Sequence, residues 1–76
     1  MTAAMPSEAI AFGPLSERER EVVALIAQGV TNRAIAEQLV IAEATAVRHV
    51  ANILNKLGFH SRAQIAVWAV ERRVAS

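Results

Sequence analysis

The chain has 76 residues, of which 54% are hydrophobic and 20% are charged, and its formal net charge is +1. A chain of this length forms one small domain, which buries only about 60% of its extended surface. The absence of cysteine excludes disulfides and thiolate metal sites, and two isolated histidines do not make a metal site. The sequence has no apolar run near the ~20 residues of a membrane span and no secretory signal pattern, so we expect a cytoplasmic protein.

Composition divides the chain into two parts. Residues 1–13 carry proline, glycine and small residues without sustained periodicity, so we interpret them as a flexible lead-in or linker before a domain at 14–76. Charge is also uneven. Residues 1–28 hold four glutamates and two arginines, a net charge of −2, whereas residues 29–76 hold six basic and three acidic residues, a net charge of +3. This asymmetry favours a nucleic-acid contact in the second part, although an ordinary solvated surface gives the same pattern.

The first helix is expected over residues 16–28. Ser16 followed by Glu19 matches the S-x-x-E capping box, in which each residue bonds the backbone N–H of the other. Gly29 supplies the left-handed residue that ends such a helix. The expected buried stripe consists of Val22, Leu25 and Ile26.

Two further helices, separated by a tight turn, give a helix-turn-helix pattern. The shorter is expected over residues 31–39, where the Thr31 hydroxyl can cap the free amides of the first turn. The longer is expected over residues 43–57 and ends at Gly58. Its apolar residues recur at helical spacing on one face, and they are Ala46, Val50, Ile53, Leu54 and Leu57. A helix of this kind fits the major groove of B-DNA, and the preceding helix lies across the backbone.

Arg48 lies opposite the apolar stripe of the helix at 43–57. A guanidinium can donate two hydrogen bonds to the O6 and N7 atoms of guanine, and apolar side chains can contact thymine methyl groups. The candidate base-contacting residues are Ala44, Val47, Arg48, Ala51, Asn52 and Asn55. The alternative for Arg48 is an ordinary solvated surface arginine.

The last helix is expected over residues 61–74, and Ser61 with Gln64 forms a second capping box. It carries two apolar arcs, and a helix in so small a domain can turn only one of them to its own core. The first arc contains Ile65, Trp68 and Ala69; the second contains Ala63, Val67, Val70 and Val74. The second arc predicts a two-fold homodimer through this helix, the alternative being small apolar residues that simply lie at the surface.

Several motifs occur in a fixed order along residues 15–62. They are LSEREREV at 15–22, LIAQGVTNRAIAEQL at 25–39, Ile41, Thr45, His49-Val50, Asn52-Ile53-Leu54, Lys56-Leu57-Gly58 and Ser61-Arg62. With these motifs the sequence resembles the LuxR-type (LuxR/FixJ/GerE) DNA-binding domain of bacterial transcriptional regulators over about residues 14–75. The resemblance implies an all-α, four-helix fold whose third helix enters the major groove and whose fourth helix mediates dimerisation. It also implies contacts with the DNA backbone by Thr31, Asn32, Arg33, Thr45 and Lys56.

The sequence departs from the family pattern at the reading helix. The family usually has Thr-Val-Lys where this chain has Thr-Ala-Val at 45–47, so a frequent base-reading lysine is missing. Ala51 replaces a residue that is often polar or basic, which leaves Arg48 as the only cation at the exposed centre of the helix. Ala42 stands where a serine usually caps this helix, and loss of such a cap costs about 1 kcal/mol.

Two functions remain open. The first is a dimeric DNA-binding output domain of a bacterial transcription regulator, either a C-terminal fragment or a stand-alone member, acting at the nucleoid. Its partner is double-stranded DNA, with RNA polymerase as a further candidate; no cofactor, metal, small-molecule ligand or membrane is expected. The second is a degenerate helix-turn-helix that serves mainly protein association and binds DNA weakly. An enzyme is not expected, because no nucleophile, base and oxyanion site come together.

Overall fold

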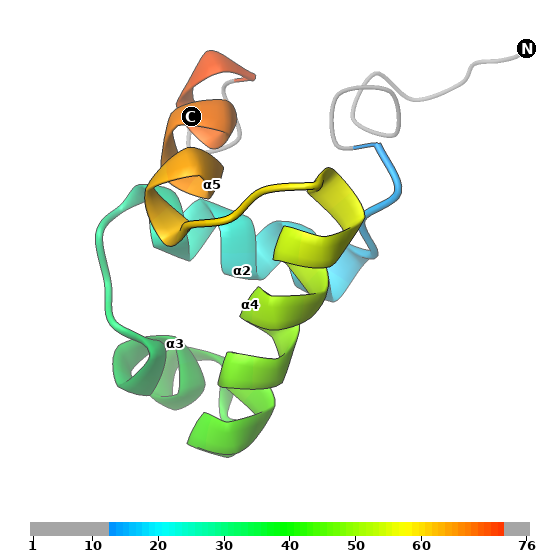
Figure 1. Cartoon of the computed structure of the whole chain (residues 1–76). Coiled ribbons are helices and arrows are strands. Elements are labelled where there is room, and N and C mark those ends of the chain that lie inside the picture. The colour runs from blue at the N-terminus through cyan, green and yellow to red at the C-terminus, as the bar shows by residue number, and fades with distance from the viewer. Residues whose placement is uncertain (1–12, 73–76) are drawn as a thin grey trace, which may run out of the picture.

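The structure is a computed structural model that describes residues 13–72 (Figure 1). These residues form four helices, namely α2 (Glu17–Ala27), α3 (Asn32–Leu39), α4 (Glu43–Leu57) and α5 (Arg62–Glu71). The predicted all-α, four-helix class is therefore confirmed. The lead-in predicted at 1–13 lies outside the described residues except for Gly13.

The helices are arranged around α2, which packs against both α4 and α5. The short helix α3 packs mainly against α4. In Figure 1, α3 and the first half of α4 lie together at the bottom of the molecule, whereas α5 lies at the top. The first turns of α4 are therefore at the end of the domain that is remote from most of α5.

The core follows the apolar stripes of the four helices. Its buried residues are Leu15, Val22, Val23, Ile26, Ile35, Ala36, Ala46, Val50, Ile53, Ile65, Trp68 and Ala69. The stripe expected on α4 is confirmed, with Leu54 and Leu57 only partly buried at its C-terminal end. On α2 the expectation is incomplete, because Val23 is fully buried and Leu25 is only partly buried.

Both predicted capping boxes are present. At α2 the Ser16 hydroxyl accepts from the Glu19 amide at 3.1 Å, and the Glu19 carboxylate accepts from the Ser16 amide at 2.9 Å. At α5 the Ser61 hydroxyl accepts from the Gln64 amide at 3.3 Å, and the Gln64 side chain accepts from the Ser61 amide at 3.1 Å. Each box satisfies two backbone N–H groups that a helix N-terminus would otherwise leave unbonded.

The C-terminal end predicted for α5 lies only partly within the described residues. Helix α5 runs to Glu71 with Arg72 as its C-cap, and positions 73 and 74 of the predicted helix lie beyond the described part of the chain. The Arg72 guanidinium lies over the Trp68 ring, 4.9 Å from the ring centroid, a favourable cation–π contact that the non-helical residue makes. Val74 lies outside the described residues.

Val40 occupies a strained position in the turn between α3 and α4. It is the C-cap of α3, with φ 57° and ψ 50°, and it is 89% exposed. A left-handed conformation costs an L-residue about 1 to 2 kcal/mol, and β-branched side chains tolerate it least. The valine side chain gains little packing there in return.

Val40→Gly is therefore expected to raise the free energy of unfolding by about 1 kcal/mol, because glycine adopts positive φ without strain. The measurement is the midpoint of urea unfolding. Val47→Gly, made inside α4, is the matched control and should lower stability by a few tenths of a kcal/mol. Equal destabilisation by the two changes would contradict the strain at Val40.

Candidate nucleic-acid interface

One face of α4 is buried and the opposite face is open. Ala46, Val50 and Ile53 pack into the core. The residues predicted to contact bases are all exposed, and they are Ala44, Val47, Arg48, Ala51, Asn52 and Asn55. We call these six residues the reading face. Because the buried stripe fixes the rotation of the helix about its axis, the orientation of the reading face is fixed as well.

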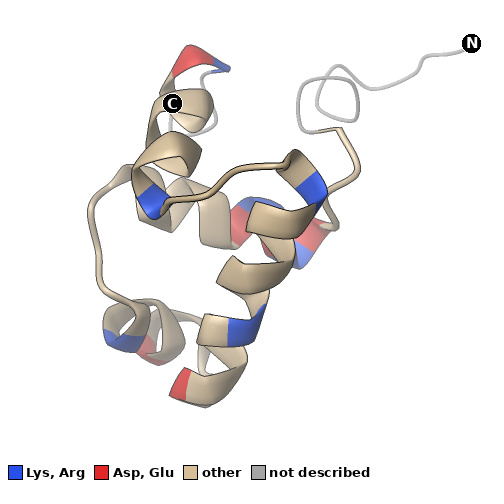
Figure 2. Ribbon diagram, in the orientation of Figure 1, with Lys and Arg blue, Asp and Glu red and all other residues tan. Residues whose placement is uncertain are grey.

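Charge is spaced out along α4. Figure 2 shows an acidic residue in its first turn and basic residues at two separate levels, which are Glu43, Arg48 and Lys56. A carboxylate in the first turn interacts favourably with the helix dipole. Arg48 alone places positive charge within the reading face.

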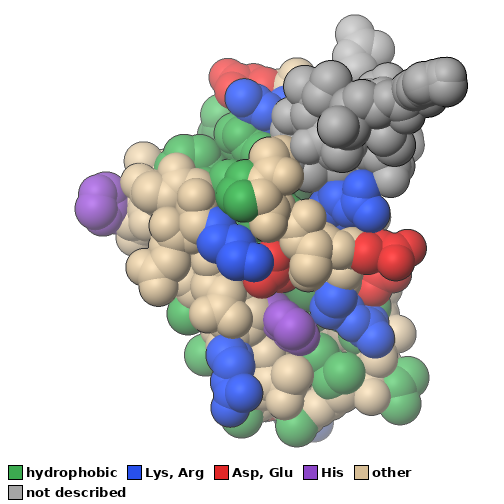
Figure 3. All heavy atoms as spheres, turned by 90° about the vertical axis from the view of Figure 1, so that its right-hand side faces the viewer, with side chains coloured by type: hydrophobic (Ala, Val, Ile, Leu, Met, Phe, Trp, Pro, Cys, Tyr) green, Lys and Arg blue, Asp and Glu red, His purple; other side chains and the backbone are tan. Residues whose placement is uncertain are grey.

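The side of the domain on the right of Figure 1 faces the viewer in Figure 3. Basic side chains are spread over this side together with acidic and histidine side chains, and its lower part displays apolar and basic groups together. A surface of this mixed kind can combine attraction to phosphates with apolar contact to thymine methyl groups.

The start of α3 presents polar groups. Thr31 is the N-cap, and its hydroxyl accepts from the Ala34 amide at 3.1 Å, as the sequence predicts. Arg33 is highly exposed and lies 3.6 Å from the carboxylate of Glu37, a surface ion pair that contributes little to stability. Its charge therefore remains available to an incoming anion at low cost.

Arg62 is a polar residue of this region that the sequence did not single out as a site. Its guanidinium donates through Nη1 to Oδ1 of Asn32 and through Nη2 to the carbonyl oxygen of Val30. It joins the first turn of α5 to the loop and first turn of α3. In the sequence, only its place in the family motif pointed to Arg62. Its contact with Asn32 joins residues 30 positions apart, and no helical spacing predicts such a pair.

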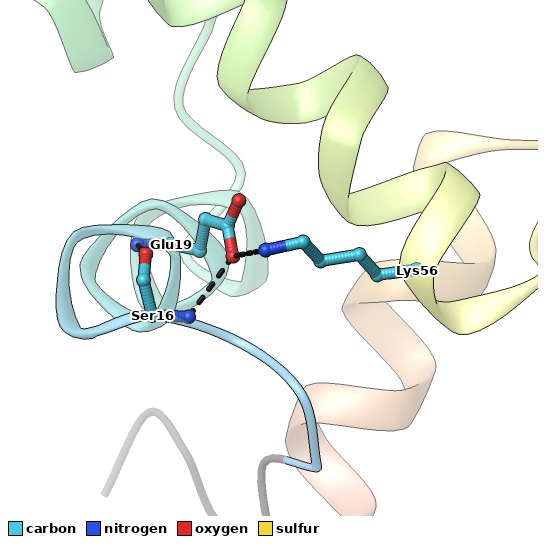
Figure 4. A network of polar contacts seen from close by, with 3 residues as sticks. All are labelled: Ser16, Glu19 and Lys56. Atoms are coloured by element: carbon cyan, nitrogen blue, oxygen red, sulfur yellow. Dashed lines mark hydrogen bonds and ion pairs between the residues drawn. The ribbon is translucent and has the colours of Figure 1, made fainter.

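Lys56 reaches away from α4 toward α2. Its Nζ atom lies 2.8 Å from Oε1 of Glu19, and the same carboxylate oxygen accepts from the Ser16 amide (Figure 4). The Glu19 side chain is buried, whereas that of Lys56 is 39% exposed. The lysine predicted to contact the DNA backbone thus already has an internal partner, and the exposed part of its side chain stays accessible.

The surroundings of Glu19 alter its pKa. Burial raises the pKa of the carboxyl group, but hydrogen bonds from Lys56 and Ser16 and the lysine charge together hold it below the ordinary value of 4.5. The carboxylate is therefore charged at neutral pH despite its burial. Its ion pair with Lys56 stabilises the packing of α2 against the last turn of α4.

The N-terminus of α4 lacks a side-chain cap. Ala42 is the N-cap and makes no side-chain hydrogen bond, and the predicted backbone contact Thr45 lies half-buried in the first turn. The first backbone N–H groups of α4 therefore have no side-chain acceptor from the N-cap. They can bond water or an anion at this end of the helix.

The outer face of α5 is apolar and open. Ile65, Trp68 and Ala69 are buried, as expected for the inner arc. On the other arc Ala63 is exposed, Val67 is 58% exposed and Val70 is 63% exposed. A shallow groove runs beside this arc and is lined by Phe59, Ala63, Gln64, Val67, Trp68, Glu71 and Arg72.

Within residues 13–72, no helix is long and apolar enough to cross a membrane, and no three potential metal ligands lie together.

Comparisons with known proteins match most of the chain. The family model described as "Bacterial regulatory proteins, luxR family" matches residues 13–69. The nitrate/nitrite response regulator protein NarL of Escherichia coli (strain K12) is 43% identical over 60 residues, which are 79% of this chain and 28% of that protein. The transcriptional regulatory protein LnrK of Bacillus subtilis (strain 168) is 44% identical over 61 residues, which are 80% of this chain and 28% of that protein.

A third relative is the DNA-binding transcriptional activator DevR/DosR of Mycobacterium tuberculosis (strain ATCC 25618 / H37Rv), 40% identical over 57 residues. These residues are 75% of this chain and 26% of that protein, so the chain spans little more than a quarter of the length of its relatives. The family match covers α2, α3, α4 and most of α5. The chain therefore belongs to the luxR family of bacterial regulatory proteins, whose model matches residues 13–69.

Proposed function

We propose that this chain is a DNA-binding output domain of a bacterial transcription regulator and that it inserts α4 into the major groove. The observation that carries the proposal is the reading face, whose six exposed residues lie opposite a buried stripe in a domain of the luxR family. Relatives that are named as response regulators and as a DNA-binding transcriptional activator support it. In this proposal residues 14–76 are the DNA-binding unit, residues 1–13 are a linker, and the site of action is the nucleoid in the bacterial cytoplasm.

Base recognition centres on Arg48. Its guanidinium can donate two parallel hydrogen bonds to a guanine, which is worth about 1 to 3 kcal/mol of discrimination. Val47 and Ala51 are exposed apolar residues close to it and suit thymine methyl groups. Ala44, Asn52 and Asn55 complete the surface that meets base edges or groove walls.

The phosphate backbone would be held from both sides of the reading helix. Thr31, Asn32 and Arg33 contribute at the start of α3, where free amides and the helix dipole favour an anion. Thr45 contributes from the first turn of α4. Lys56 contributes through the exposed part of its side chain while it keeps its ion pair with Glu19. Of the five backbone contacts it has the strongest competing role.

Binding to DNA is expected to fall steeply with salt. Arg33 and Lys56 would each displace about one counterion, so log K should fall with log salt at a slope of about −2 per protomer, or about −4 for a dimer. The measurement is fluorescence anisotropy of the purified chain on a random-sequence duplex pool between about 50 and 200 mM salt. Absence of binding even at low salt would contradict the proposal and favour the protein-association function.

We further propose that two copies pair through the outer arc predicted from the sequence, Ala63, Val67, Val70 and Val74, of which the first three lie on α5 and Val74 lies outside the described residues. The exposure of the described part of this arc and the adjacent groove support an isologous contact. The paired copies would bind neighbouring half-sites and leave other surfaces for RNA polymerase.

Val70→Glu is expected to reduce cooperative binding to two adjacent half-sites, because it places like charges at the two-fold axis. Since Val70 is exposed, the variant should unfold at the same temperature as the wild type. The readout is the Hill slope of binding to a duplex with two half-sites, compared with Glu37→Gln as a control change of charge on α3. An unchanged slope would exclude this arc as the interface.

A further inference from the structure

Arg62 links two parts of the domain that are far apart in sequence. It is the first residue of α5, and its guanidinium bonds the Asn32 side chain at the start of α3 and the Val30 carbonyl in the loop before α3. All three residues are half-buried, whereas Thr31, which lies between the two bonded residues, is exposed. A forked, partly buried hydrogen-bonded contact holds its partners in a narrow range of positions.

The chemistry of this contact determines which way the Asn32 amide faces. A guanidinium has hydrogen-bond donors only, so it can face the Oδ1 atom of Asn32 and cannot face the Nδ2 group. Both atoms are attached to the same carbon and point in different directions. The Nδ2 group, with its two donors, is therefore turned away from Arg62.

Asn32 occupies the first position of α3, where an anion would sit. The backbone N–H groups of the first turn have no carbonyl partner inside the helix. The Thr31 hydroxyl accepts from one of them, the N–H of Ala34. A phosphate at this position could accept from a free backbone amide and from the Asn32 Nδ2 group together. With the opposite amide orientation, the Asn32 carbonyl oxygen would face the phosphate and repel it.

We infer that Arg62 is a positioning residue for DNA binding, which holds the Asn32 amide so that Nδ2 donates to a backbone phosphate. This inference rests on the proposed function, because it needs Asn32 at the DNA backbone. In this inference Arg62 acts by orienting the Asn32 amide, an effect that a positive charge alone does not have. Arg62 also fastens the start of α3 to α5, so the phosphate contact is held by the same helix that carries the outer apolar arc.

The test is a double-mutant cycle with Arg62→Met and Asn32→Ala, in which the probe is a labelled random-sequence duplex pool of about 30 base pairs, roughly three helical turns. Each single change should weaken binding about tenfold at low salt, the size of one lost hydrogen bond to a charged group. Arg18→Met is the matched control, because Arg18 is a partly exposed arginine that pairs with Glu21 on α2. It should weaken binding about twofold, through charge alone.

If Arg62 acts through Asn32, its effect should disappear in protein that already carries Asn32→Ala. In that background Arg62→Met should weaken DNA binding by no more than Arg18→Met does. Additive losses of affinity would overturn the inference. An arginine that only stabilises the fold, or only attracts phosphate by its charge, would weaken binding equally with asparagine or alanine at position 32. Thermal unfolding is measured for every variant.

Asn32→Asp provides a second test that leaves the acceptor for Arg62 in place. It should keep at least the wild-type melting temperature and bind at least tenfold more weakly, because it retains no amide donor and its carboxylate repels the phosphate.

Wild-type affinity in Asn32→Ala or Asn32→Asp would overturn the inference whatever the stability of Arg62→Met. Absence of DNA binding by the wild type would overturn the proposed function and this inference together. Wild-type binding with an additive cycle would overturn the inference alone.

Discussion

Replacing Arg48 by alanine is expected to weaken binding to a selected duplex site by about tenfold or more and to abolish the preference for guanine at one base pair. The reason is that Arg48 is the only cation of the reading face, so no neighbouring side chain can take over a bidentate contact. The measurement starts from a site selected from a random pool. Affinity is then compared on that site and on versions in which each guanine is replaced in turn by 7-deazaguanine, which lacks the N7 acceptor.

Two comparisons separate base reading from simple attraction. Arg18→Ala removes an exposed arginine on α2 and should change the affinity by no more than about twofold. In wild-type protein, one 7-deazaguanine position should weaken binding, but by less than the Arg48 variant does, because its O6 atom still accepts; the same position should cost Arg48→Ala little further affinity. Equal weakening of Arg48→Ala on every sequence would assign Arg48 to a phosphate instead.

Lys56→Met is expected to lower the free energy of unfolding by about 1 to 3 kcal/mol at neutral pH, because it leaves the buried Glu19 carboxylate without its main partner. The upper end is reduced by the partial exposure of the lysine, which water screens. Urea unfolding at pH 7 measures the effect. The control is Arg18→Met, which breaks the exposed pair with Glu21 and should cost no more than about 0.5 kcal/mol.

The same pair predicts a pH dependence of known sign. Because the pKa of Glu19 in the folded protein lies below its ordinary value of 4.5, its contribution is complete above pH 4.5 and is lost as the pH falls through the lowered pKa. In Lys56→Met, burial still acts to raise the pKa of Glu19 while the lysine contribution is gone. The stability difference between wild type and Lys56→Met should therefore shrink below pH 4.5. A constant difference between pH 7 and pH 3 would exclude this ion pair as its source.

Local sequence patterns predicted the helices well. The capping boxes at Ser16 and Ser61 and the glycine after each of α2 and α4 act over a few residues, so the sequence displays their complete chemistry. The buried stripe and the reading face of α4 also follow from helical spacing alone.

Contacts between distant residues could not be predicted. Arg62 and Asn32 are 30 residues apart, and Lys56 and Glu19 are 37 residues apart, so their pairing depends on how whole helices pack. Glu19 was predicted only as a capping residue, since its spacing to Ser16 accounts for it without a second role. The left-handed Val40 was also missed, because valine is among the residues least expected at positive φ.

The separation of the two faces of α4 has an evolutionary consequence. Ala46, Val50 and Ile53 hold the helix in place, and none of the six residues on the opposite face belongs to the core. Single substitutions on that open side change the free energy of unfolding by only about 0.5 kcal/mol in general. The domain can therefore acquire new target sequences one mutation at a time, without compensating changes in its interior, and an engineer can redesign its specificity on an unaltered scaffold.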